Sequence, residues 1–278
     1  MQTRYSEESV IVPVGGESGT HRPRFFVRET RLIVTTNFEE LDYANTPLGE
    51  LILRRRRVLS LDQDVYEVKL DDTFLMSSLV NASEIALAER CLEKLEGGEI
   101  DVAVGGLGLG YTAKAALTHA EVRSVVVIEF LSEVIGWHNR LLVPAAETLT
   151  RDTRCRFVNG DFFAMASNPE LGLDLESPGR RFDAILLDID HSPSYVLDES
   201  HERFYRPDGL QLLSEHLSDR GVFGLWSAGD PDDQVVDALS ACFASAETAV
   251  IEFRNPLLNI DDRNTIYIAH RPVHRSPK

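Results

Sequence analysis

The spacing of hydrophobic positions changes near residue 80. From Pro23 to about Ser78, short runs rich in β-branched and aromatic residues are separated by Asn, Asp, Pro and Gly, which are typical of turns. Further along, continuous Val, Ile and Leu runs alternate with stretches of helical spacing. Strands that are hydrophobic on both faces are typical of a parallel sheet covered by helices on either side. The pattern predicts a small antiparallel β region followed by an α/β domain.

The second part has the order expected of a doubly wound fold. A helical stretch over residues 82–98 ends in Gly-Gly, and apolar strands and helical segments then alternate before two final strand-like segments. We therefore expect a Rossmann-like, mostly parallel sheet over residues 81–278. Residues 22–80 are expected to form a small β-rich domain. Residues 1–21 are polar and rich in Gly and Ser, and we expect them to be flexible.

Composition narrows the classes of function. The chain has 278 residues and a formal net charge of −17, which argues against nonspecific binding to a nucleic-acid backbone and is compatible with a cationic substrate. Three widely spaced cysteines show no metal-ligand or disulfide pattern, so we expect a reduced, cytoplasmic protein with no metal. No run of 18 apolar residues occurs, and no membrane association is expected.

Four consecutive arginines, Arg54–Arg57, are the one strongly basic feature. They are compatible with a nucleic-acid contact. We favour the alternatives that they protect an exposed strand from edge pairing or lie at a subunit contact.

A glycine-rich turn follows the first strand of the α/β part. Gly106, Gly108 and Gly110 form G-x-G-x-G, and a shifted frame that ends at Ala113 also fits the loose dinucleotide fingerprint. Glu129 closes the next apolar strand, where an acid can accept both ribose hydroxyls. These features predict an adenosyl cofactor, but they fit a dinucleotide and S-adenosylmethionine equally well.

Acids after the third and fourth strands distinguish the two cofactors. Asp161 follows the third strand, where an adenine amino group would lie, and Phe162 is a candidate ring contact. Asp188 and Asp190 follow the fourth strand at the same edge. Binding of NAD does not require so many acids, and no residue is a clear electrophile for hydride transfer. The pattern favours an adenosyl sulfonium.

These segments resemble the spermidine synthase family over roughly residues 40–270. The resemblance is carried by five stretches: "VGGLGLG", "VVVIEFLSEVIGWHNRLLVP", "NGDFFAMA", "RFDAILLDIDHSP" and "ERFYRPDGLQLLSEHLSDRGVFGLWSAG". It implies the fold of class I S-adenosylmethionine-dependent methyltransferases, preceded by a small β-domain. It also implies a homodimer, and S-adenosylmethionine or its decarboxylated form as co-substrate.

By that resemblance, Glu129 binds ribose, Asp161 binds adenine and Asp188 is catalytic. A carboxylate at Asp188 would attract an ammonium group, orient it and help remove its proton before in-line displacement at the sulfonium. Asp190 and Tyr205 are the further candidates for the acceptor side of the site. The resemblance therefore implies transfer of an aminopropyl or related alkyl group to an amine.

The chain departs from the family pattern on the acceptor side. Gly108 stands where the family has an aspartate, and Asp190 follows Asp188 after one residue instead of two. Trp226 occupies the position of a family glutamine. Two alternatives therefore remain open: a methyltransferase with another acceptor, and a non-catalytic protein that binds an adenosyl nucleoside.

Overall fold

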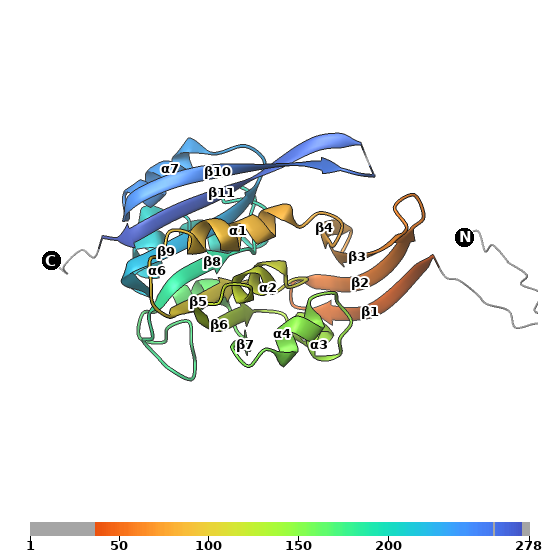
Figure 1. Cartoon of the computed structure of the whole chain (residues 1–278), viewed down its shortest axis with the longest axis horizontal. Helices are drawn as coiled ribbons and strands as arrows, with labels where there is room; N and C mark the ends of the chain where they lie inside the picture. The colour runs from red at the N-terminus through yellow and green to blue at the C-terminus, as the bar shows by residue number, and fades with distance from the viewer. Residues whose placement is uncertain (1–36, 258, 274–278) are drawn as a thin grey trace, which may run out of the picture.

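A computed structural model describes residues 37–257 and 259–273 of the chain. The expected flexible segment, residues 1–21, lies outside the described residues. Two sheets organise the rest (Figure 1). The first is a four-stranded antiparallel sheet in the order β1-β2-β3-β4. Its strands are β1 (Phe38–Thr46), β2 (Gly49–Val58), β3 (Gln63–Leu70) and β4 (Thr73–Ser77).

The second sheet has seven strands in the order β10-β11-β9-β8-β5-β6-β7. Neighbours from β7 to β9 run parallel, and β11 runs antiparallel to both β9 and β10. The strands are β5 (Ile100–Gly105), β6 (Val122–Glu129), β7 (Cys155–Asn159), β8 (Phe182–Leu187), β9 (Leu217–Ala228), β10 (Phe243–Asn255) and β11 (Ile260–Pro272). This arrangement confirms the predicted α/β class with a mostly parallel, doubly wound sheet.

Helices cover both faces of the seven-stranded sheet. Those on one face are α1 (Ala82–Leu92), α2 (Tyr111–Leu117), α3 (Ser132–Asn139) and α4 (Ala146–Arg151). Those on the other are α5 (Phe162–Ala166), α6 (Pro207–Ser214) and α7 (Asp233–Ser240), and a 3-10 turn, η1 (Glu199–Arg203), precedes α6.

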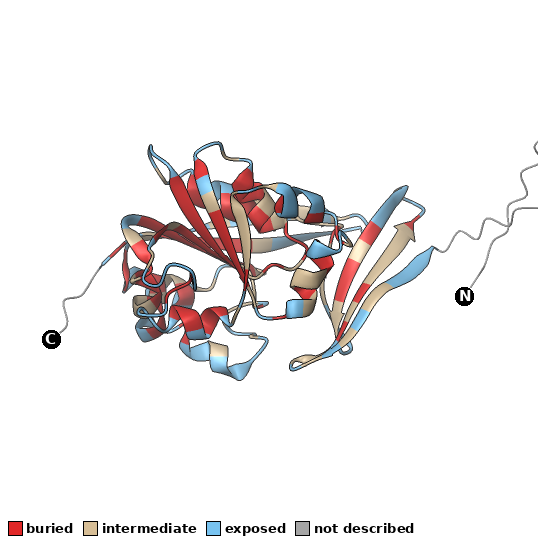
Figure 2. Ribbon diagram, turned by 90° about the horizontal axis from the view of Figure 1, so that it is seen from below, coloured by how far each residue is buried: buried red, intermediate tan, exposed pale blue. Residues whose placement is uncertain are grey.

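Alternate residues of the central strands enter opposite cores. Val104 and Leu186 pack under α1–α4, whereas Ala103 and Ile185 pack under α5–α7. Successive side chains of a strand point to opposite faces, so a strand covered on both sides must be hydrophobic throughout. Figure 2 shows these buried strands inside the larger part of the molecule.

The four-stranded sheet joins the larger part through its inner face. Leu51, Leu53 and Val68 belong to the same core cluster as α1–α4. The indole of the buried Trp137 on α3 donates from Nε1 to Asp42 Oδ2 at 2.7 Å. Arg140 also contacts that carboxylate, at 2.5 Å. One carboxylate on β1 thus anchors the sheet to α3.

The four consecutive arginines lie on β2, an inner strand paired with both β1 and β3. The expectation of an exposed edge strand is therefore wrong. Each guanidinium is matched by a carboxylate: Arg54 and Arg56 contact Glu67, Arg55 contacts Glu39, and Arg57 contacts Asp62 and Asp64. The run neutralises acids of its own sheet.

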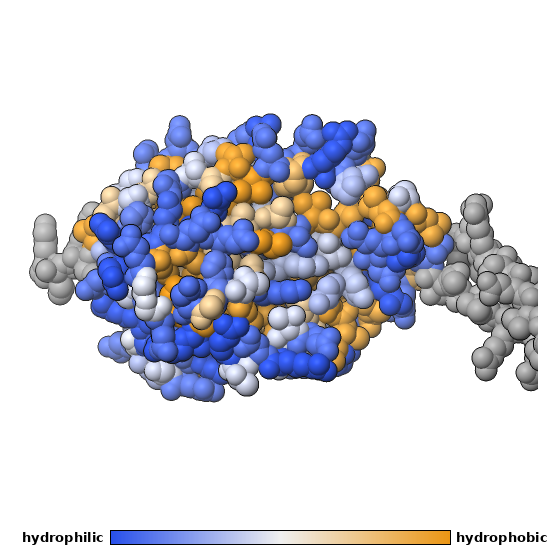
Figure 3. All heavy atoms as spheres, viewed as in Figure 1, coloured by the Kyte–Doolittle hydropathy of each residue, from blue (hydrophilic) through white to orange (hydrophobic). Residues whose placement is uncertain are grey.

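Hydrophilic residues spread over most of the face seen in Figure 3, and the hydrophobic groups between them are small. On the four-stranded sheet, Phe38, Tyr43 and Phe74 remain exposed. Within the described ranges, no helix combines the length and apolar character needed to cross a bilayer.

Replacing Trp137 with Phe tests the anchor between the two sheets. The change removes one hydrogen bond to a carboxylate and leaves a small cavity, so we expect the free energy of unfolding to fall by about 2 kcal/mol. Urea unfolding measures this loss. Tyr43→Phe, at an exposed side chain on β1, is the control, with an expected change within about 0.5 kcal/mol. Equal losses in the two variants would contradict the anchoring role.

Candidate active site

The loop between β5 and α2 crosses the carboxyl ends of three neighbouring strands. Asp188 N donates to Gly105 O and Gly106 N donates to Ile128 O, each at 2.9 Å, so β5 is held between β8 and β6. Gly106 has φ +92°, and a Cβ there would lie 2.2 Å from Asp188 O. Only glycine allows the loop to approach β8 this closely. Gly106 and Gly108 are left half-buried at the edge.

Glu129, at the end of β6, is fastened beneath this loop. Its Oε2 accepts from Leu107 N at 2.9 Å and its Oε1 accepts from Leu131 N at 2.8 Å. Burial raises the pKa of Glu129, and these backbone N–H groups oppose that rise by stabilising the charged form. The carboxylate therefore lies directly against the glycine loop.

Gly108 is covered by a side chain from the other sheet. Its φ is +46°, and a Cβ there would lie 2.7 Å from the sulfur of Met76 on β4. A thioether thus occupies the space into which a side chain at position 108 would project. The aspartate that the family resemblance leads one to expect is absent, and Met76 fills its place.

His138 on α3 holds the glycine loop through a hydrogen bond to its backbone. Its Nε2 lies 2.9 Å from Gly108 O, so Nε2 carries the proton and donates it. Burial lowers the pKa of His138, which keeps the ring neutral, and Nδ1 is buried without a partner among the described residues. Gly110, with φ +89°, then caps α2. A Cβ at Gly110 would lie 2.8 Å from the His138 ring.

Asp161 and Phe162 follow β7. Asp161 is exposed and caps α5, where its Oδ1 accepts from Phe163 N at 2.9 Å and from Ala164 N at 3.1 Å. Phe162 is only 2% exposed and packs edge-on against Phe163 and Phe204. Because its ring has no free face for a nucleobase, we no longer assign Phe162 a ring contact.

Asp188 follows the last residue of β8. Its Oδ2 accepts from Thr112 Oγ1 on α2 at 2.7 Å. Burial raises the pKa of Asp188 to about 6, while the bond from Thr112 opposes this rise. No ion pair joins Asp188 to a basic side chain within residues 37–257 and 259–273. A carboxyl group in this state is suited to taking up a proton near neutral pH.

Glu84, in the first turn of α1, is a neighbour of Asp188 that the sequence did not reveal. Burial raises the pKa of Glu84 to about 7, with a further contribution from the charge of Asp188. The order of the elements in the sequence nevertheless indicates where Glu84 lies. The helix that leads into the first parallel strand runs antiparallel to it, so its first turn lies at the carboxyl edge of the sheet.

Asp190 and Tyr205 bind each other and not Asp188. The Tyr205 hydroxyl donates to Asp190 Oδ2 at 2.7 Å. Leu197 N donates to Asp190 Oδ1 at 2.7 Å, and His201 Nδ1 lies 2.9 Å from the same oxygen. The structure thus brings two of the three predicted catalytic residues together in a buried cluster that orders the loop after β8.

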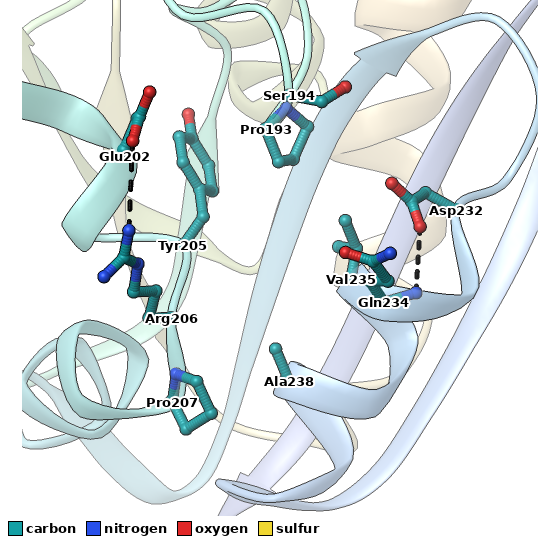
Figure 4. Close-up of a pocket in the computed structure, with 10 residues that line it drawn as sticks. All are labelled: Pro193, Ser194, Glu202, Tyr205, Arg206, Pro207, Asp232, Gln234, Val235 and Ala238. Atoms are coloured by element: carbon teal, nitrogen blue, oxygen red, sulfur yellow. Dashed lines mark hydrogen bonds and ion pairs between the residues drawn. The ribbon is translucent and has the colours of Figure 1, made fainter. Parts of the chain in front are cut away.

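A surface cavity of about 400 Å³ lies beside this cluster. Figure 4 shows one wall formed by Glu202, Tyr205, Arg206 and Pro207, and the opposite wall by Asp232, Gln234, Val235 and Ala238 of α7 and its cap. Asp188 is not among its lining residues. We therefore assign the Tyr205 ring to this cavity and not to the Asp188 site.

Comparisons with known proteins place the fold. The chain is similar to a crystal structure of spermidine synthase in complex with the transition-state analogue AdoDATO, with a TM-score of 0.63 and 16% identity over 84% of this chain and 73% of the other. Spermidine synthase from Thermotoga maritima gives a TM-score of 0.62 at 16% identity over 84% and 72%. No family model and no curated protein matches. The chain therefore has a spermidine synthase-like fold.

In the part of the chain that the structure describes, no group of three or more His, Cys, Asp and Glu is arranged to hold a metal.

The two raised carboxyl pKa values predict a pH-dependent stability. Glu84 and Asp188 keep their protons to higher pH in the folded chain than in the unfolded one, so stability falls as pH rises from about 4 to about 7. Glu84→Gln removes this loss for Glu84. We expect the variant to gain on the order of 3 kcal/mol over wild type at pH 8 and little at pH 4.

Urea unfolding at both pH values measures this difference. Glu89→Gln, at an exposed position on the same helix, is the matched control and should leave the difference near zero. A Glu84→Gln variant that is less stable than wild type at pH 8 would contradict the raised pKa of Glu84.

Proposed function

We propose that this chain is a transferase that binds an adenosyl sulfonium, S-adenosylmethionine or its decarboxylated form, and passes an aminopropyl or related alkyl group to an amine. The observation that carries the proposal is the position of the glycine loop, which contacts Glu129 through Leu107 N and Asp188 through the close approach at Gly106. A ribose acceptor and a basic carboxyl group thus lie on either side of one glycine turn.

The nucleoside half uses residues at the ends of β6 and β7. The Glu129 carboxylate would accept the two ribose hydroxyls, and the half-buried Gly106 and Gly108 would pack against the nucleoside without side chains. Asp161 is exposed beside them, and its capping bonds end on Oδ1, so Oδ2 is the oxygen available to an adenine amino group. These residues fit the group that the fold implies.

The acceptor half centres on Asp188. The sulfonium supplies the electrophilic carbon, and attack requires a neutral amine. Asp188 would attract the ammonium form, hold it in line and take up its proton. The nitrogen lone pair then forms the new N–C bond while the C–S pair leaves with sulfur, and the proton lost by the nitrogen passes to Asp188 and on to water.

Met76 favours a second candidate, a methyltransferase with the same nucleoside site. Its sulfur occupies the space where a carboxylate at position 108 would contact the amine of an aminopropyl chain. Without that carboxylate, no acidic side chain at position 108 favours the decarboxylated co-substrate over S-adenosylmethionine. A nucleoside-binding protein without catalysis is the third candidate and predicts binding without turnover.

Binding measured by calorimetry, together with an assay for the product, separates these candidates. We expect binding of S-adenosylmethionine, its decarboxylated form and methylthioadenosine, with product formed from the decarboxylated form and a diamine. Product only from S-adenosylmethionine would establish methyl transfer. Binding of none of the three would overturn the nucleoside site. Asp188→Asn should abolish turnover and leave the affinity for methylthioadenosine within about twofold, and full activity of this variant would refute the role of Asp188.

Glu129→Gln tests the nucleoside half by itself. The change removes a charged acceptor of two ribose hydroxyls, so we expect methylthioadenosine affinity to fall about 10- to 100-fold. The matched control is Glu133→Gln, in the first turn of the following helix and half-buried like Glu129, with an expected change of less than twofold. Equal affinities in the two variants would contradict ribose binding by Glu129.

We also propose that the protein acts in the cytoplasm as a homodimer. The exposed Phe38, Tyr43 and Phe74 of the four-stranded sheet support this as the contact surface. A monomer in sedimentation at micromolar concentration would contradict it.

A further inference from the structure

Trp226 lies beside Asp188 at the carboxyl edge of the seven-stranded sheet. Leu187 of β8 pairs with Leu225 of β9, so the next residues of the two strands, Asp188 and Trp226, are also neighbours. Neighbouring strands of a sheet are about 4.8 Å apart. Both side chains contact helices on the same face of the sheet, because Asp188 bonds to α2 and Trp226 bonds to α1. The indole ring therefore forms part of the surroundings of the candidate carboxyl group.

The hydrogen-bonding capacity of the Trp226 ring is already used. Its Nε1 donates to Ser83 Oγ at 2.9 Å, and Asn264 Nδ2 donates to the same buried hydroxyl at 2.8 Å. An indole has one N–H group and no acceptor, so the half-buried ring offers a ligand only its π surface. A glutamine, which the family resemblance leads one to expect at this position, would instead offer an amide oxygen and an NH2 group. This wall of the candidate site is therefore aromatic where a polar amide is expected.

The loop after β8 brings two further rings to Trp226. Ser192 N donates to Tyr195 O at 3.2 Å and Tyr195 N donates to Ser192 O at 3.0 Å, which closes a tight turn. The backbone N–H of the last residue of β9 donates to His191 O at 2.9 Å and fastens the start of this turn. The His191 ring meets the rings of Trp226 and Tyr195 edge-on, with centroids 6.4 Å and 5.5 Å away. These three residues form an aromatic row that begins beside Asp188 and ends at the exposed Tyr195.

The aromatic row is separate from the surface cavity beside Tyr205. Pro193 and Ser194, at the tip of the turn, line that cavity (Figure 4). The three rings of the row are not among its lining residues. Of these two surfaces, the row is therefore the one that adjoins Asp188.

We propose that the aromatic row is a specificity subsite of the acceptor, and that the preferred acceptor carries an aromatic ring joined to its nucleophilic group by a short chain. This inference rests on the proposed function and narrows its acceptor class. Aromatic rings pack favourably edge-to-face or offset, with centroids about 4.5–7 Å apart. The ring of the acceptor packs against Trp226 in this way, and the short chain places the nucleophile beside Asp188.

A linear diamine fits the aromatic row less well than a ring does. Its second ammonium group would lose water beside Trp226, and the row itself contributes no carboxylate to accept its N–H donors. Attraction of a cation to the indole face offsets only part of that loss, by about 0.5–2 kcal/mol. An aromatic ring loses little hydration and gains contact area. The row therefore favours a ring-bearing amine over a diamine.

Three amines tested in the presence of saturating methylthioadenosine measure this preference. 2-Phenylethylamine carries an aromatic ring, 2-cyclohexylethylamine carries a saturated ring of similar size, and 1,4-diaminobutane carries a second ammonium group. By calorimetry at pH 8 we expect wild type to bind 2-phenylethylamine about tenfold more tightly than 1,4-diaminobutane and about threefold more tightly than 2-cyclohexylethylamine. Equal or tighter binding of the diamine would overturn the proposal.

Variants of Trp226 show whether the ring itself carries the preference. Trp226→Phe retains a ring without the bond to Ser83, and we expect it to retain the preference for 2-phenylethylamine over the diamine. Trp226→Gln replaces the ring with an amide and should lower this preference about tenfold. Both variants should bind methylthioadenosine within about twofold of wild type. The control is Phe253→Gln, at a half-buried position on β10, which pairs with neither β8 nor β9, and it should match wild type.

Tryptophan fluorescence provides a readout that a purely structural role would not move. The chain contains two tryptophans, and Trp137 is only 1% exposed. A change in emission when 2-phenylethylamine binds therefore reports on the half-buried Trp226. We expect such a change in wild type and none in Trp226→Phe. Binding by calorimetry without any change in wild-type emission would overturn the proposal even if no variant folds.

Two failures are distinguishable. Wild type that binds methylthioadenosine but none of the three amines, or a folded Trp226→Gln variant that retains the wild-type preference, overturns the aromatic subsite and leaves the nucleoside site standing. Wild type that does not bind methylthioadenosine overturns the proposed function, and the inference with it.

Discussion

The close approach of the glycine loop to the end of β8 is the constraint on which the site depends. Position 106 has no room for a side chain, because a Cβ there would lie 2.2 Å from the carbonyl oxygen of Asp188. The same crossing brings the backbone of Leu107 onto Glu129 and the start of α2 onto Asp188. Any displacement of the loop would therefore separate Glu129 from Asp188.

The spacing of hydrophobic residues predicted the sheet, because strands buried on both faces leave a strong signal. Glycines and strand-end acids likewise predicted Gly106, Glu129 and Asp188, whose positions follow from topology. Side-chain direction in loops and at the starts of short helices does not follow from it. Asp190 lies two residues after Asp188 yet joins a separate buried cluster, and Phe162 turns into the core. Glu84 was missed because it lies on a helix far away in the sequence, and only the fold brings it near Asp188.

Buried acids at the two ends of the sheet are treated differently. Asp101, at the amino end of β5, contacts Arg123 and Arg180, and Asp174 contacts Arg156 and Arg180. Burial by itself would raise the pKa of each of these acids, but the guanidinium groups lower it below the usual value. Glu84 and Asp188, at the carboxyl end, have no such partners among residues 37–257 and 259–273, and their pKa values rise. In the described residues, arginines thus compensate the buried acids away from the candidate site, whereas the carboxyl groups of the candidate site have no arginine partner.

Through Met76, the four-stranded sheet contacts the glycine loop of the larger part. Because its sulfur lies over Gly108, we expect the effects of substitutions at these two positions to be coupled and not additive. A side chain at position 108 requires the flexible Met76 thioether to move aside, and the φ of +46° there disfavours residues other than glycine whatever stands at position 76. The freedom of the Met76 side chain to move thus sets how large a residue the glycine turn can hold at position 108.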